Sequence, residues 1–108
     1  MNTLTLRSIQ TESHPETKMI FWYLFATSKG AKTRIKIINL LQRQPHNTNR
    51  ISQELMMDYK AIKHHIQILE KNNIIGKFDA QYGAAFYPST VFEENKNLFD
   101  EIVSRVSV

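Results

Sequence analysis

A chain of 108 residues, 42% hydrophobic and 22% charged, has room for one globular domain with a modest core. It contains no cysteine, which excludes disulfides, thiolate metal sites and cysteine catalysis. Its longest apolar run covers residues 19–26, well short of the roughly 20 residues that a membrane span needs, and no signal-peptide pattern opens the chain. We therefore expect a cytoplasmic domain without membrane contact.

The net charge of +4 is concentrated in the middle of the chain. Residues 29–71 hold nine lysines and arginines against three acidic residues, whereas residues 1–28 are neutral and residues 72–108 are slightly acidic. Such a cluster attracts a polyanion, because binding releases condensed counterions. The alternative is a solvated surface that is basic without binding anything.

The first part of the chain predicts a short N-terminal segment followed by a helix. Residues 1–12 show no clear period, which indicates a tail or a short strand. Ser13 can cap a helix that has Pro15 in its first turn and Glu16 three residues on, and Gly30 is expected to end it. Residues 13–108 are then expected to form a single domain.

A second helix is predicted over residues 33–44, where apolar residues recur at helical spacing and Pro45 ends the pattern. The remaining face is basic, and we expect solvent around its charged residues, which are Arg34, Lys36 and Arg43.

Two helices in close succession follow. Asn47 or Thr48 is expected to cap the first, over residues 49–55, and a connection of three residues leads to the second, over residues 59–72. Two helices joined by so short a turn, the second of them basic, are typical of a helix-turn-helix.

A β-hairpin is predicted next. Residues 74–79 and 84–87 read as short strands, with Gly83 available for a positive φ between them and Asn73 for the left-handed position after the preceding helix. A capping box of Thr90 and Glu93 then starts a last helix, over residues 90–106. The expected fold class is mainly α with a small β-hairpin wing, a winged helix-turn-helix with extra N- and C-terminal helices.

The basic helix Tyr59–Lys71 has two faces. Ile62, Ile66 and Leu69 follow one apolar stripe, which predicts burial, and His65 lies beside that stripe as a packed, hydrogen-bonded side chain. The opposite face and its surroundings offer donors for phosphates and base edges, and an α-helix fits the major groove. The predicted DNA-binding residues are Arg50, Tyr59, Lys60, Lys63, His64, Gln67, Lys71 and Lys77. The alternative is an ordinary exposed amphipathic helix.

No constellation for catalysis or metal binding is visible. The adjacent His64 and His65 point about 100° apart on a helix and cannot easily share one metal ion. No nucleophile elbow, carboxylate pair or phosphate loop occurs. We expect neither an enzyme nor a bound cofactor or metal.

The aromatic run of residues 21–25 is apolar all round its helix, and a chain this short offers little interior for so many rings. This pattern favours a homodimer. The alternative is a monomer whose core is filled by these rings. The predicted dimerisation helices are 13–29 and 90–106, and the interface residues are Phe21, Trp22, Phe25, Leu98, Phe99, Ile102 and Val106.

Several segments resemble ArsR-like winged-helix transcriptional regulators. Residues 33–41, TRIKIINLL, are similar to the threonine-arginine opening of a helix in that family, and residues 61–69, AIKHHIQIL, to its recognition helix. Residues 21–30, 47–55 and 58–60 look closest to archaeal members. The resemblance spans residues 20–90 and implies a homodimer built by the first and last helices. Lys63 stands where the family has a hydroxyl residue, which favours phosphate contact.

Two other functions remain open. A winged helix can bind protein instead of DNA, as in subunits of the transcription machinery. A regulator can also respond to a metal or another ligand, but the metal-sensing branch of the family uses cysteines, or acidic and histidine ligands on its terminal helices. This chain has no cysteine and no histidine after His65, so metal sensing is not expected.

Overall fold

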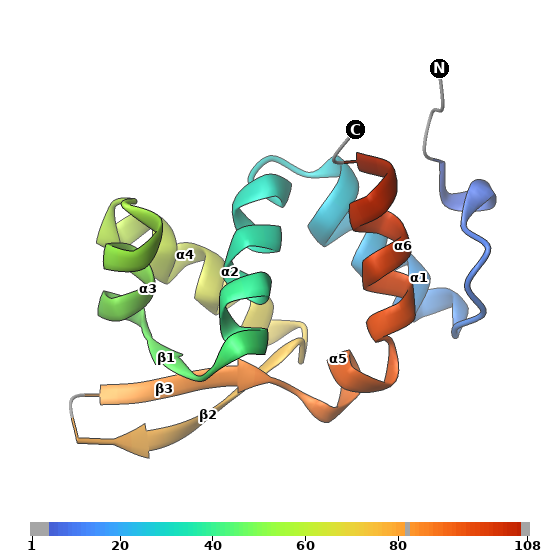
Figure 1. Cartoon of the computed structure of the whole chain (residues 1–108). Coiled ribbons are helices and arrows are strands. Elements are labelled where there is room, and N and C mark those ends of the chain that lie inside the picture. The colour runs from blue at the N-terminus through green and yellow to red at the C-terminus, as the bar shows by residue number, and fades with distance from the viewer. Residues whose placement is uncertain (1–4, 82, 107–108) are drawn as a thin grey trace.

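The structure is a computed structural model that describes residues 5–81 and 83–106, with helices packed on a small sheet (Figure 1). In chain order the elements are a 3-10 helix η1 (Leu6–Ser8), α1 (Pro15–Trp22), a π-helical turn η2 (Tyr23–Thr27), α2 (Ala31–Arg43), β1 (His46–Asn47), α3 (Thr48–Leu55), α4 (Tyr59–Lys71), β2 (Ile75–Ala80), β3 (Gly83–Pro88), α5 (Thr90–Glu94) and α6 (Lys96–Val106). The predicted fold class is confirmed.

The N-terminal segment is more than a tail. It contains η1, and Ile9 is buried in the core with 6% of its surface exposed. The amides of Gln10 and Thr11 donate hydrogen bonds of 2.7 and 2.8 Å to the carboxylate of Glu101 on α6. A charged acceptor from the far end of the chain therefore anchors this segment, which no local sequence pattern indicates.

The start and end of the first helix differ from the prediction. His14, not Ser13, caps α1, since its Nδ1 atom accepts a hydrogen bond of 3.2 Å from the Glu16 amide. The Ser13 hydroxyl instead lies 3.0 Å from the side-chain oxygen of Asn95. Gly30 has φ 91° and occupies the cap position of α2, so it serves the start of one helix rather than the end of another.

An aromatic cluster joins α1 and η2 to α5 and α6. The rings of Phe21 and Phe92 stack at 6.0 Å between centroids, and those of Phe25 and Phe99 meet edge to face at 5.0 Å. Five of the seven expected interface residues are buried in the core of the single chain, namely Phe21, Phe25, Leu98, Phe99 and Ile102. Trp22 and Val106 are half-buried and pack against the same core. The rings therefore fill the core of the single chain.

The wing is a three-stranded antiparallel sheet in the order β1-β3-β2. Gly83 in the hairpin has φ 110°, and Asn73, which follows α4, has φ 60°, both as predicted. The short strand β1 was not predicted; it pairs His46 with Phe86 and Asn47 with Ala85. Two residues are too few for a period, so only the distant partner strand defines β1.

The last predicted helix is two helices. Ser89, rather than Thr90, caps α5 by accepting a hydrogen bond of 3.1 Å from the Phe92 amide. The chain turns at Asn95 before α6 begins. This turn lets Phe92 and Phe99 approach to 5.1 Å between ring centroids.

Candidate nucleic-acid interface

The helix-turn-helix consists of α3 and α4, each with a side-chain cap. The Asn47 side chain accepts a hydrogen bond of 2.8 Å from the Arg50 amide at the start of α3. Asp58 accepts from the amides of Lys60 and Ala61 at the start of α4. Between the helices, Met56 adopts a left-handed conformation with φ 51°. These caps fix where α4 begins and how it leaves the turn.

The two predicted faces of α4 are present. Ile62, Ile66 and Leu69 are at most 3% exposed and pack in the core. The side chains expected to meet DNA are exposed on the opposite face, and they are Lys60, Lys63, His64, Gln67 and Lys71. The three lysines among them have no acidic partner within ion-pair distance in residues 5–81 and 83–106. Their charge is available to an external anion.

Of the other three expected DNA-binding residues, Tyr59 is the first residue of α4, and Arg50 and Lys77 lie on the neighbouring α3 and β2. Lys77 on β2 is 3.3 Å from a carboxylate oxygen of Glu70, and Arg50 on α3 is 3.0 Å from one of Glu54. Tyr59 is 45% exposed and lines a cleft between α3 and the hairpin with Gly83. The structure therefore brings the predicted set around one helix, but it ties two of the cations to acids.

Arg34 is buried, with 2% of its surface exposed, although we expected solvent around it. Its Nε atom donates to the Leu24 carbonyl at 2.9 Å, and Nη2 donates to the Ser28 hydroxyl and to the Lys29 carbonyl. The helical period was a sufficient signal, because position 34 precedes Ile38 by four residues on the apolar stripe. We expected exposure because the arginine side chain is charged.

His65 is the fourth partner of Arg34, with His65 Nδ1 3.2 Å from Arg34 Nη1. The expectation of a packed, hydrogen-bonded histidine is confirmed. Burial, the nearby Arg34 and then His64 lower the pKa of His65 below its ordinary value. The guanidinium keeps its charge despite burial, since an arginine stays protonated in proteins. The recognition-helix candidate α4 is thus joined to α2 and η2 by one buried cation.

Within the described ranges, no group of three or more histidine, cysteine or acidic residues is placed to hold a metal ion. Over the same residues, none of the helices combines the length and apolarity required to cross a membrane. The other two histidines make local hydrogen bonds. His14 caps α1, and Nδ1 of His46 forms a hydrogen bond of 2.7 Å with the Gln44 carbonyl.

Two comparisons relate this chain to known regulators, one by its sequence and one by its fold. Residues 31–77, which run from α2 into β2, match the family model described as bacterial regulatory protein, arsR family. A solved structure of similar fold is the transcriptional regulator HlyU from Vibrio vulnificus CMCP6, with a TM-score of 0.61, 11% sequence identity and 81% of each chain covered. The fold is a winged helix-turn-helix. The arsR-type segment supports a DNA-binding transcriptional regulator.

Two further solved structures share the fold. The adhesin competence repressor AdcR from Streptococcus pyogenes has a TM-score of 0.54 and 16% identity, covering 74% of this chain and 61% of that one. A mutant of ZitR from Lactococcus lactis has a TM-score of 0.54 and 15% identity, covering 82% of this chain and 73% of that one. No curated protein sequence gives a significant match. Since these sources are bacterial, the archaeal resemblance remains an expectation from the sequence.

Proposed function

We propose that this protein is a transcriptional regulator that binds duplex DNA in a sequence-specific manner as a homodimer, with α4 in the major groove. The observation that supports this best is the outer face of α4, where Lys60, Lys63 and Lys71 are exposed and unpaired within the described residues. The buried stripe and the Asp58 cap hold that face rigidly outward, so little conformational entropy is lost when DNA binds.

Few side chains on α4 can read the base sequence. His64 and Gln67 are the exposed groups that can address base edges, and the helix has no arginine for a bidentate contact to guanine. Phosphate contacts then supply most of the affinity, which makes it steeply dependent on salt.

The test is a titration of labelled duplexes, selected from a random pool by the wild-type protein, at about 150 mM salt. Lys63→Glu is expected to abolish binding, because it removes a phosphate contact and adds repulsion at the centre of the interface. Lys36→Glu is the matched control, since Lys36 is an exposed, unpaired lysine of the described residues on α2. Undiminished binding by Lys63→Glu would contradict the docking, and a wild-type protein without salt-dependent affinity would favour a protein-binding winged helix.

The proposed homodimer needs a surface other than the buried rings. The apolar side chains that α1 and η2 leave in solvent are Met19, Ile20 and Tyr23, which are 59%, 36% and 59% exposed. They lie at i, i+1 and i+4 and so share one side of the helix, where a second copy can cover them. In such a dimer the two α4 helices would enter successive major grooves about 34 Å apart.

Sedimentation of the free protein tests the dimer. Wild-type protein at about 100 μM is expected to be dimeric, and Tyr23→Glu is expected to dissociate it, because a carboxylate would be buried at the contact. Met56→Glu changes a side chain that is 91% exposed at the α3–α4 turn and serves as the control. A wild-type monomer at this concentration would contradict the dimer and leave the DNA-binding test standing.

A further inference from the structure

The loop between η2 and α2 is fastened to the side of α4. A Cβ atom on Gly30 would lie 2.4 Å from Cε1 of His65, so the backbone of the loop packs directly on that ring. Arg34 extends the attachment, because it donates to the Lys29 carbonyl at 3.3 Å while it lies 3.2 Å from the His65 ring nitrogen. The backbone of Lys29 is therefore held in place beside α4.

The loop and the wing occupy opposite flanks of α4. Glu70 marks the side of α4 that faces the wing, because it pairs with Lys77 of β2. His65 marks the side that faces the loop, because Gly30 packs on its ring. On a helical wheel the buried stripe separates these two residues on the inside, and the exposed Lys63 and Gln67 separate them on the outside. In Figure 1 the sheet lies below α4, and the η2–α2 connection lies at the upper end of α2.

We propose that Lys29 contacts the phosphate backbone along the edge of the major groove opposite the wing, so that α4 lies between two basic flanks. This inference rests on the proposed function. A helix in the major groove has a phosphate strand on each side, and the wing reaches only one of them. Lys29 is exposed and has no acidic partner within ion-pair distance among the described residues.

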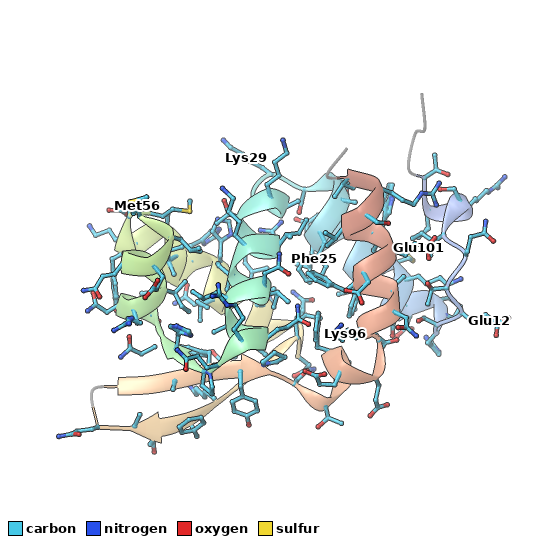
Figure 2. The ribbon with its side chains drawn as sticks, viewed as in Figure 1. Glu12, Phe25, Lys29, Met56, Lys96 and Glu101 are labelled. Atoms are coloured by element: carbon cyan, nitrogen blue, oxygen red, sulfur yellow. The ribbon has the colours of Figure 1, made fainter. Side chains whose placement is uncertain are left out.

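The position of Lys29 suits this role. The ring centroid of His64, on the outer face of α4, lies 5.7 Å from that of His65. Only the His65 ring therefore separates the loop from the proposed DNA contact surface. In Figure 2, Lys29 stands at the upper end of α2, on the same edge of the molecule as Met56, which precedes α4. Because Arg34 fixes the backbone of Lys29, contact with DNA costs only the conformational entropy of the Lys29 side chain.

The neighbouring Lys32 provides a matched control. It is exposed on α2, two residues before Arg34, which places it about 200° from the side chain that points to α4. Lys32 therefore faces away from the proposed DNA, although it is only three residues from Lys29.

Titration of one selected duplex at several salt concentrations between about 50 and 200 mM tests the contact. Lys29→Ala is expected to weaken binding about three- to tenfold and to reduce the slope of log K against log salt by about 1, whereas Lys29→Arg keeps both and Lys32→Ala changes neither. Equal values for the Lys29→Ala and Lys32→Ala proteins, with Lys63→Ala weakened, would overturn this contact and leave the proposed function intact. A wild-type protein without salt-dependent affinity would overturn both.

A mapping experiment locates the contact independently. Because the chain has no cysteine, Lys29→Cys and Gln81→Cys, in the hairpin turn, each introduce a unique attachment point for an iron chelate that cleaves nearby DNA backbone. Cleavage from the two positions is expected at opposite edges of one major groove. Cleavage at the same edge, or from Gln81→Cys alone, would overturn the proposal. Unchanged melting temperatures of both labelled proteins would show that the fold is retained.

Discussion

The guanidinium of Arg34 lies 3.2 Å from Nδ1 of His65, and this pair joins α2 to α4. Since Arg34 is a donor only, Nδ1 must accept, which places the ring proton of a neutral His65 on Nε2. A protonated ring would set two cations at hydrogen-bond distance. The contact therefore belongs to the neutral form of His65 alone.

The pair predicts that stability falls on acidification. Burial first, then Arg34 and His64, lower the pKa of His65 in the folded protein, so between this lowered pKa and the ordinary value of about 6.5 the unfolded chain binds more protons. The contribution is present above about pH 6.5 and is lost as the pH falls through the folded pKa. Urea unfolding between pH 5 and 8 measures it. His65→Asn keeps an acceptor without titrating and is expected to flatten the pH dependence, whereas His64→Asn, on the exposed face, retains most of it.

Gly30→Ala is expected to destabilise the protein by about 2 kcal/mol or more, since it combines a positive φ with a steric conflict. The φ of 91° is unfavourable for alanine, and its Cβ would meet the His65 ring at 2.4 Å. Denaturant unfolding of the double variant with His65→Ala separates the two causes. The double variant should recover the steric part, so that Gly30→Ala costs less in the His65→Ala background. Equal costs in both backgrounds would show that the ring does not restrict this position.

Glu101→Gln is expected to destabilise the fold by about 1–3 kcal/mol and to release the N-terminal segment. Burial alone would raise the pKa of Glu101, but hydrogen bonds from Gln10 and Thr11, with Arg105 nearby, lower it below the ordinary value. A glutamine retains one acceptor and loses the charge, so it cannot hold both amides. The carboxylate stabilises the protein above its unfolded pKa, and this stabilisation disappears as the pH falls through the folded pKa.

Hydrogen exchange at the Gln10 and Thr11 amides reports the release directly. Asp100→Asn is the matched control, because Asp100 is also on α6 but pairs with Lys96 on the surface. Protection of the two amides that survives Glu101→Gln would contradict the anchoring role.

Glu70→Gln is expected to strengthen DNA binding about threefold while changing the free energy of unfolding by less than about 1 kcal/mol. It removes a negative charge beside α4 and frees Lys77, whose side chain is 55% exposed in the pair. Glu54→Gln frees Arg50 in the same way on α3. Anisotropy titrations and urea unfolding measure both quantities. Weaker DNA binding by the Glu70→Gln protein would mean that the pair positions Lys77 instead of neutralising it.

Most of the helix-turn-helix is visible in the sequence because it depends on local rules. A period of 3.6 residues places Ile62, Ile66 and Leu69 inside α4 and the lysines outside, whatever the rest of the chain does. The left-handed Asn73 and Gly83 are likewise set by the φ angles that their turns require. These features need no knowledge of distant residues.

The features that were missed or misplaced depend on contacts between distant parts of the chain. Strand β1 exists because His46 pairs with Phe86, and the N-terminal segment is anchored because Glu101 reaches it from α6. No local pattern can indicate such partners, since each segment is too short or too polar to signal burial by itself.

The aromatic residues and Arg34 show what only the tertiary structure decided. The sequence by itself determined that residues 21–25 are apolar on every side of their helix. Only the break at Asn95 folds Phe92 and Phe99 onto Phe21 and Phe25, so one copy buries them. We expected solvent around Arg34, although the helical period puts position 34 on the inner face. Its burial requires four acceptors that come together only when η2, the following loop and α4 meet around it. Buried polar groups need partners, and those partners are supplied by the fold rather than by neighbours in sequence.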